Sequence, residues 1–218
     1  MTDAIGLLLA AGAGRRMGLP KALVEGADGL PWAVSAARTL AAGGCTEVVV
    51  VIGAAAPIVR ALLAAEPVTF IEAADWNEGM GASLRAGLDA IAERDAVAAL
   101  VHLVDLPDVG ADVIRRVLRH AEPGILARAS YGSTPGSTPG STPGGAPGHP
   151  VLLGRDHWAA IAAECSGDTG ARDYLARHDV LEVDCSDLAT GADIDTHAGA
   201  RPSTFSDAGS TILPKLGQ

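Results

Sequence analysis

The residues best suited to chemistry lie in a glycine-rich loop near the start of the chain. Residues 5–25 read IGLLLAAGAGRRMGLPKALVE, an apolar run followed by glycines and three cations. Gly12 and Gly14 allow the backbone to approach a ligand closely and to point N–H groups at phosphate oxygens. Arg16 offers two parallel donors to a phosphate, and Lys21 adds a compact charge. The loop is therefore predicted to bind a phosphorylated ligand.

Three interpretations of this loop compete. A P-loop needs GxxxxGK followed by Ser or Thr, whereas Lys21 is preceded by Pro20 and followed by Ala22. A dinucleotide fingerprint needs GxGxxG, but Met17 stands at the third glycine position and the glycine is displaced to Gly18. A plain structural turn leaves the three cations unexplained. The pattern favours a nucleoside triphosphate loop, and dinucleotide binding remains the alternative.

The carboxylate of Asp105 lies at a position in the sequence that suits a metal ligand. Asp105 follows the apolar run 99–104 and precedes Pro107. A carboxylate at the end of a buried strand is costly unless it has a partner. Mg²⁺ takes few carboxylates together with substrate phosphates, so Asp105 is the predicted metal ligand. The alternative is a cap for the helix that follows, for which Asp108 is nearer.

Three further segments carry polar residues beside glycines. In EGMGASL, residues 78–84, main-chain groups at Gly79 and Gly81 could read the edge of a base, and Ser83 either adds a hydroxyl or caps a helix. In CSGDTGAR, residues 165–172, Asp168 and Arg172 indicate either an anion site or a capped helix with a solvated arginine.

The remaining candidates lie later in the chain. His149 either faces a second ligand or is an ordinary surface histidine. Asp193 and Asp195, in ADIDT, point to the same side if the chain is extended there. They form either part of the metal site or a turn.

The elements that must position these residues alternate along the chain. The expected strands are continuous apolar runs, as in a parallel sheet covered on both faces by helices. They lie at residues 4–10, 47–53, 68–73, 99–104, 150–154 and 180–186, with helices expected at 31–44, 56–66, 81–95, 110–122, 155–164 and 171–179. Ligands of such sheets bind at the carboxyl ends of the strands, which is where the candidate residues lie.

Residues 131–147 interrupt this alternation with three Ser-Thr-Pro-Gly units. Proline supplies no N–H donor and glycine holds no preferred conformation. The segment is therefore predicted to be a flexible insertion in a single domain at residues 1–200. Residues 201–218 turn polar and irregular and are expected to form a C-terminal tail.

Composition limits the classes of function. The chain has 218 residues, of which 48% are hydrophobic, and a formal net charge of -10. The acidic balance argues against general nucleic-acid binding. The three cysteines, Cys45, Cys165 and Cys185, show no zinc-site spacing and suit a reducing compartment. With no signal peptide and no apolar stretch of about 20 residues, a cytoplasmic protein that does not enter a membrane is expected.

Several of these motifs together resemble one family. LLLAAGAGRRMGLPKAL is similar to the LAAGxGxRMGxPK motif of the nucleotidyltransferases that build molybdenum cofactor dinucleotides. WNEGMGASLRAGL, VDLPDV, GHPVLL, GDTGARDYL and DIDT resemble later motifs of that family in the same order. The chain most resembles the molybdenum cofactor cytidylyltransferases among the MobA-like NTP transferases. Val104 and Leu106 depart from the family pattern, which usually has glycine and glutamine there.

The resemblance implies a fold and a set of roles. The fold would be α/β, a single three-layer, Rossmann-like nucleotidyltransferase domain of the nucleotide-diphospho-sugar transferase type, with a mostly parallel central sheet. Arg16, Lys21 and Asp105 would be catalytic, and Asp105 and Asp195 would hold Mg²⁺. Nucleotide-binding positions would be Leu9, Ala10, Ala11, Gly12, Gly14, Arg16, Lys21, Gly79, Gly81 and Ser83. Acceptor-binding positions would be Asp168, Arg172 and His149.

The implied reaction transfers CMP from CTP to the terminal phosphate of molybdopterin and releases pyrophosphate. A molybdoenzyme or its chaperone would be the partner that receives the product. GTP in place of CTP, or phospholactate or a sugar phosphate as acceptor, remains an alternative. An NAD(P)H oxidoreductase and a non-catalytic cofactor carrier are alternatives of other classes.

Overall fold

The apolar run before the glycine loop forms the central strand of the fold. All seven residues of β1 (Ala4–Ala10) are buried. It pairs in parallel with β3 (Glu47–Ile52) on one side and with β5 (Ala98–Leu103) on the other. Because helices cover both faces of these strands, neither face needs polar residues, and the sequence reads as continuous apolar runs.

The main sheet has seven strands in the order β4-β3-β1-β5-β7-β6-β8. Its remaining members are β4 (Val68–Glu72), β6 (Leu126–Tyr131), β7 (Ala146–Gly154) and β8 (Leu181–Asp184). β7 runs antiparallel to both of its neighbours, whereas the other pairings of this sheet are parallel. The predicted mostly parallel sheet is therefore confirmed.

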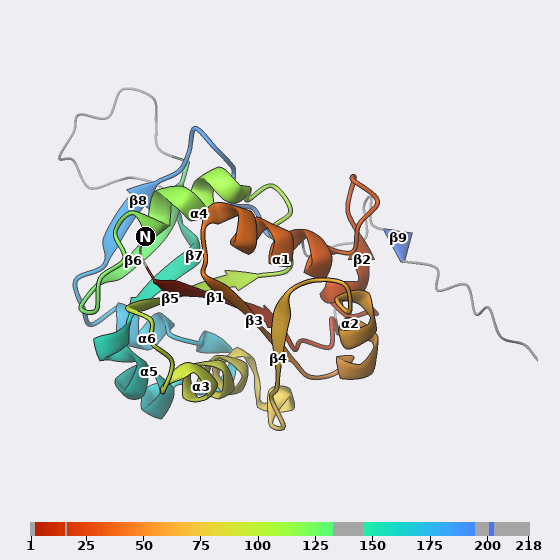
Figure 1. The fold of residues 1–218 in the computed structure, drawn as a ribbon, viewed down its shortest axis with the longest axis horizontal. Helices are drawn as coiled ribbons and strands as arrows, with labels where there is room; N and C mark the ends of the chain where they lie inside the picture. The colour runs from red at the N-terminus through yellow and green to blue at the C-terminus, as the bar shows by residue number, and fades with distance from the viewer. Residues whose placement is uncertain (1–2, 16, 133–145, 195–200, 203–218) are drawn as a thin grey trace, which may run out of the picture.

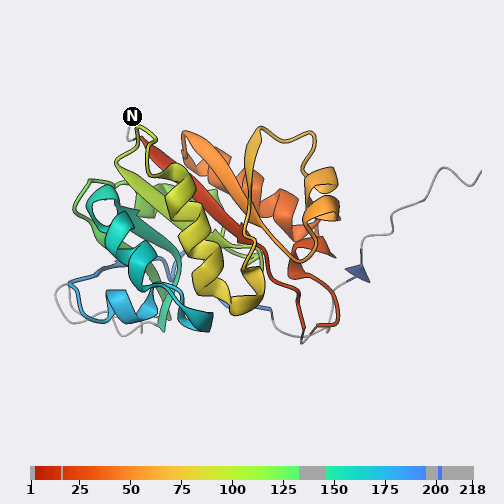
Figure 2. The same cartoon turned by 90° about the horizontal axis from the view of Figure 1, so that it is seen from below.

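Helices cover the sheet on both sides and make three layers (Figures 1 and 2). One hydrophobic cluster joins the sheet to α1 (Trp32–Gly43), α2 (Ala56–Leu62) and α4 (Ala111–Leu118). A second cluster joins the opposite face to α3 (Met80–Ile91), α5 (Trp158–Glu164) and α6 (Arg172–Leu175). The predicted three-layer α/β architecture is confirmed.

Short elements complete the fold. Single 3₁₀ turns lie at Lys21–Leu23, Trp76–Glu78, Arg155–His157 and Gly167–Thr169. A separate antiparallel pair joins β2 (Val24–Glu25) to β9 (Arg201–Pro202).

The structure is a computed structural model that describes residues 3–15, 17–132, 146–194 and 201–202. Within these ranges, every helix is too short or too polar to cross a membrane. The Ser-Thr-Pro-Gly units lie outside the described residues. The flanks of the predicted insertion are strand: Tyr131 ends β6, and Ala146 begins β7.

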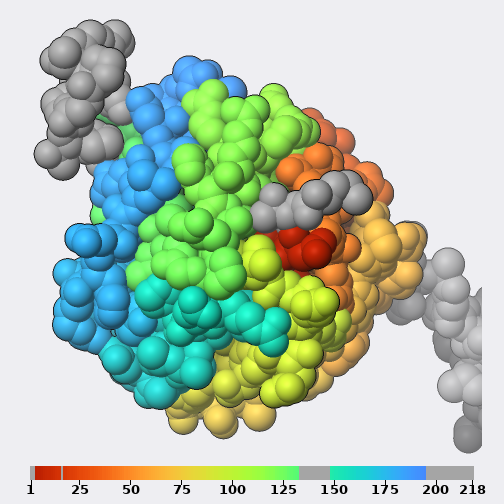
Figure 3. Space-filling model, turned by 60° about the vertical axis from the view of Figure 1, so that its left-hand side comes forward, coloured from red at the N-terminus to blue at the C-terminus, as the bar shows by residue number. Residues whose placement is uncertain are grey.

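Segments distant in sequence meet on the side of the molecule shown in Figure 3. There the blue segment that carries β8 borders the green segment that carries α4 and β6. Arg116 of α4 forms an ion pair with Asp187, and Thr190 donates its backbone N–H and its hydroxyl to Asp108 Oδ2. Asp108 was predicted as a helix cap, which is wrong. The N-cap of α4 is Gly110. The carboxylate of Asp108 instead holds residues 186–194, the segment that follows β8 and is called the closing segment below.

Candidate functional site

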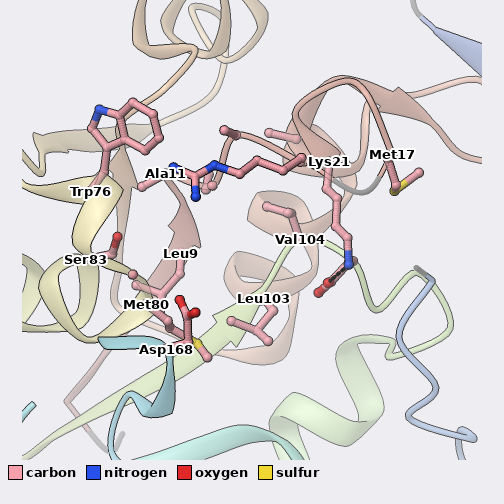
Figure 4. A pocket seen from close by; sticks show the side chains of 18 of the residues that line it. Leu9, Ala11, Met17, Lys21, Trp76, Met80, Ser83, Leu103, Val104 and Asp168 are labelled. Atoms are coloured by element: carbon pink, nitrogen blue, oxygen red, sulfur yellow. Dashed lines mark hydrogen bonds and ion pairs between the residues drawn. The ribbon is translucent and has the colours of Figure 1, made fainter. Parts of the chain in front are cut away.

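A pocket of about 390 Å³ opens at the carboxyl ends of β1 and β5 (Figure 4). Ten of the predicted site residues line it: Leu9, Ala10, Ala11, Gly12, Gly14, Lys21, Gly79, Ser83, Asp105 and Asp168. The glycine loop, the start of α3 and the end of β5 thus converge on one cavity. Figure 4 places Trp76 and Ser83 on one side of the pocket and Lys21 on the other.

The glycine loop has a backbone shape that depends on Gly14. Its φ is +61°, and its carbonyl accepts the N–H groups of Met17 and Gly18. A Cβ on Gly14 would lie 1.8 Å from the carbonyl oxygen of Leu19. Residues with a side chain rarely adopt this φ, so the tight return of the chain toward Lys21 requires glycine here.

The loop and the strand end meet in an ion pair between Lys21 and Asp105. Lys21 Nζ lies 2.6 Å from Asp105 Oδ2, and the two side chains are 20% and 14% exposed. These residues are 84 positions apart in sequence, and the parallel pairing of β1 with β5 brings them together. A cation of the glycine loop and a carboxylate at the end of β5 therefore face each other directly.

Asp105 has capacity for one more ligand. Its Oδ1 is buried and accepts no hydrogen bond from any residue in the described ranges. Leaving such an oxygen unpaired is costly, and a hard cation is a partner that suits it. No group of three His, Cys, Asp or Glu side chains within the described ranges could hold a metal by itself. The donor set of this pocket fits Mg²⁺ that is bound jointly by carboxylate and phosphates.

The closing segment contacts Asp105, and this brings the start of the DIDT motif close to the predicted metal ligand. The backbone N–H of Ile194 donates to the carbonyl oxygen of Asp105 at 3.1 Å. Asp193, immediately before it, is exposed. Asp195 and Arg16 lie outside the described residues, so their predicted roles stay predictions.

The predicted base-reading loop leads directly into α3. Gly79 has a φ of +122° and caps α3, which begins at Met80. Ser83 is therefore inside the first turn and is not the N-cap, and its buried side chain lines the pocket. Gly81 is absent from the lining and serves packing, because a Cβ there would lie 2.7 Å from the backbone nitrogen of Ser166.

The sequence analysis did not identify Trp76 as a pocket residue. Trp32 and Trp158 lie in the core, at 4% and 3% exposure. Trp76 is half-buried and lines the pocket opposite Lys21 (Figure 4). Its position directly before the glycine loop of α3 was the available signal.

A second pocket of about 280 Å³ adjoins the first, and both are lined by Leu9 and Met80. Of the predicted acceptor-binding residues, His149 and Arg172 line this second pocket, whereas Asp168 lines the first. Arg128, on β6, also lines the second pocket and was not predicted. Its strand was not recognised in the sequence.

Two histidines near Asp105 are held neutral. Burial lowers the pKa of His149 to about 4, although the charge of Asp105 opposes the shift. Burial lowers the pKa of His102 to about 3, and His149 adds to the effect. Near neutral pH both imidazoles are uncharged, so the positive charge near Asp105 comes from Lys21 rather than from the histidines.

The chain is similar to known proteins along most of its length. Residues 6–183 match the family model of the MobA-like NTP transferase domain. The chain is 40% identical, over 88% of its length and 91% of the relative's, to nicotine blue oxidoreductase of Paenarthrobacter nicotinovorans.

Solved structures share the fold. Rv0371c of Mycobacterium tuberculosis H37Rv superimposes with a TM-score of 0.73 at 26% identity, over 89% of this chain and 93% of that one. A nucleotidyl transferase of Methanothermobacter has a TM-score of 0.73 at 20% identity, over 90% and 93% of the two chains. With its fold, its glycine loop and nearly all of its described length accounted for, the chain belongs to the MobA-like NTP transferase domain family.

Proposed function

We propose that this protein is a nucleotidyltransferase that transfers a nucleoside monophosphate from a nucleoside triphosphate to a phosphorylated acceptor. The observation that carries the proposal is the contact between Lys21 Nζ and Asp105 Oδ2 at the glycine-loop pocket. It brings Lys21, the cation proposed to bind the triphosphate, beside a carboxylate that has a buried oxygen without a hydrogen bond in the described ranges. Family membership supports the same reaction class.

The proposed reaction needs little covalent help from the protein. An oxygen of the acceptor's phosphate attacks the α-phosphorus, and the bond from that phosphorus to the oxygen bridging to the β-phosphate breaks. Pyrophosphate leaves with the electron pair. A phosphate monoester is largely dianionic at pH 7, so no base is required, and positioning with charge neutralisation supplies most of the rate.

This chain's residues supply those two contributions. The glycine loop directs backbone N–H groups at the triphosphate, and Lys21 neutralises the charge that develops on pyrophosphate. Asp105, with Asp195 as the proposed second ligand in preference to Asp193, would hold Mg²⁺. When bound, Mg²⁺ supplies charge neutralisation at the phosphates. Trp76 offers an aromatic wall on which a base can stack.

The proposed substrates are CTP and the molybdenum cofactor, whose pterin phosphate would become a cytosine dinucleotide. The base preference rests on the Gly-x-Gly-x-Ser segment at the start of α3, and GTP is the alternative. The direct test is pyrophosphate release with each nucleotide and Mg²⁺, with and without purified molybdenum cofactor. Release with CTP that depends on the cofactor is expected, and a preference for GTP would overturn the choice of base.

A second candidate is an NAD(P)H-dependent oxidoreductase. The 40% identical relative is named nicotine blue oxidoreductase, and a glycine loop of this kind could hold the diphosphate of a dinucleotide. The displaced third glycine at Gly18 and the Lys21–Asp105 pair weigh against it.

Ligand-dependent melting separates the two candidates. A ligand that binds the folded state raises the melting temperature. CTP with Mg²⁺ is expected to raise it, and the rise should be lost in Lys21→Met. A rise with NADH together with none for any nucleoside triphosphate would favour the oxidoreductase.

A further inference from the structure

The second pocket combines aliphatic walls with a few cationic and polar groups. Leu84, Val101, Val151, Leu153 and Leu175 supply much of its wall. Its polar side chains include Arg128, His149 and Arg172. About 280 Å³ is at the small end for ligand sites, so it suits a small molecule or one end of a larger one. The apolar walls favour a ring system over a heavily charged group.

Arg128 is fixed on one side of this pocket. It lies on β6 opposite Val151 of β7 and Glu182 of β8. Its Nη2 donates to Glu182 Oε1 at 2.6 Å, and the two side chains are 27% and 20% exposed. Its Nε is buried, and no residue in the described ranges accepts a hydrogen bond from it. The guanidinium is thus held by one edge, and the side chain, which is 27% exposed, lines the pocket.

The two arginines of the pocket, Arg128 and Arg172, differ in the kind of ligand group that they can bind. Arg172 is exposed, and its side chain forms no ion pair with the described part of the chain. It can therefore meet an anion. The charge of Arg128 is already matched by Glu182, and an anion placed against it would also meet the repulsion of that carboxylate. A neutral acceptor atom is therefore the partner that suits an exposed guanidinium N–H of Arg128.

We propose that Arg128, positioned by Glu182, determines the specificity of the second pocket by donating an exposed guanidinium N–H to a neutral ring nitrogen or carbonyl oxygen of the bound molecule. The occupant is then a compact ring compound with a hydrogen-bond acceptor on its ring and an anionic group directed to Arg172. Identifying that occupant as the acceptor of nucleotidyl transfer rests on the proposed function. The hydrogen bond itself does not.

Equilibrium binding without nucleotide tests the hydrogen bond separately from turnover. The probes are 1-naphthyl phosphate and its quinolinyl and isoquinolinyl counterparts, which replace one ring CH by nitrogen. Calorimetric titration of the full chain should show at least one nitrogen-containing probe binding about tenfold tighter than the naphthyl probe, as expected for a hydrogen bond to a charged donor.

Variants assign that difference to Arg128. Arg128→Lys keeps a cation beside Glu182 but lacks the planar guanidinium fork, so the difference should shrink to about twofold or less while the naphthyl affinity is retained. Glu182→Gln removes the group that holds the guanidinium and should also reduce the difference. Arg172→Met should weaken all the phosphate probes by a similar factor.

The proposal is overturned if no probe binds, if all the probes bind equally, or if Arg128→Lys keeps the full difference. Should Arg128→Lys fail to fold, as judged by its melting curve, a full difference retained in Glu182→Gln would overturn it. If the proposed function alone were wrong, the nitrogen-containing probes would still bind more tightly than the naphthyl probe, but no pyrophosphate would be released in the turnover assay.

Discussion

The proposed chemistry of the site is concentrated in two residues, Lys21 and Asp105. Each would be costly alone in a pocket of this kind, because a partly buried charge needs a partner. In the free protein they partner each other at 2.6 Å. A triphosphate would compete for Lys21, and its arrival would leave Asp105 available to a cation.

Asp105→Asn should reduce turnover by about 10²–10³-fold, as the loss of a group that stabilises transition-state charge does. The amide keeps the shape of the side chain but loses the negative charge that would hold Mg²⁺. Steady-state pyrophosphate release measures the effect, and circular dichroism checks the fold. Asp193→Asn is the matched control, because that side chain is exposed. Full turnover by Asp105→Asn would remove Asp105 from the catalytic machinery.

His102 should make stability sensitive to acid. Its pKa is lowered from 6.5 to about 3 by burial, with His149 adding to the effect. Below pH 6.5 the unfolded chain binds a proton that the folded protein does not, so the free energy of unfolding falls as pH falls. Above pH 6.5 both states are neutral and the contribution vanishes.

Urea denaturation at pH 7 and pH 5 measures this contribution, which should be about 2 kcal/mol over that interval. His102→Asn should lose that much less stability than the wild type on the same acidification. His120→Asn, at an exposed position, should behave like the wild type. Equal pH dependence in His102→Asn and wild type would contradict the prediction.

At the scale of elements, two glycine-dependent loops bound the first pocket. One follows β1 and needs the positive φ of Gly14, and the other precedes α3 and needs that of Gly79. A Cβ on Gly79 would lie 2.5 Å from the backbone carbonyl of Gly167. The start of α3 is therefore packed against the segment that carries Asp168.

Gly14→Ala and Gly18→Ala form a matched pair. Both positions have positive φ, at +61° and +74°, so both substitutions should cost about 1–2 kcal/mol of backbone strain. Only at Gly14 would the new Cβ meet a backbone atom, the Leu19 carbonyl oxygen. Gly14→Ala should lower nucleotide affinity and melting temperature well beyond Gly18→Ala, as measured by calorimetric titration and thermal unfolding. Equal effects would mean that the loop readily adopts another path.

Across the whole molecule, the sequence predicted what depends on local pattern. The apolar run at residues 4–10 matched β1 at both ends, and the alternation of strands with helices predicted the sheet. The placement of Lys21 and Asp105 at one edge of the sheet also followed, because parallel strands end there, whereas their direct ion pair was not predicted.

What the sequence did not predict depends on distant partners. β6 was missed because Arg128 and Ser130 interrupt its apolar pattern, and its place is set by pairing with β7 and β8. Arg128 was missed with it. Asp108 was misassigned because its partner, Thr190, is 82 positions away.

Asp108→Ala tests the docking of the closing segment. Loss of the bonds from Thr190 should loosen residues 190–194, of which Ile194 contacts Asp105. The Mg²⁺ concentration for half-maximal turnover should rise severalfold, with little change in melting temperature. Asp112→Ala removes only a surface pair with Arg115 and should leave both unchanged. An unaltered Mg²⁺ requirement in Asp108→Ala would separate the closing segment from the metal site.

The most direct test of nucleotidyl transfer follows the α-phosphorus itself. The protein is incubated with CTP labelled at the α-phosphate, Mg²⁺ and purified molybdenum cofactor, and the label is located by chromatography. The predicted result is label in a dinucleotide, with one pyrophosphate released for each label transferred and no transfer by Asp105→Asn. Label that stays in CTP, while the protein oxidises NADH with an organic ring substrate, would contradict the assignment.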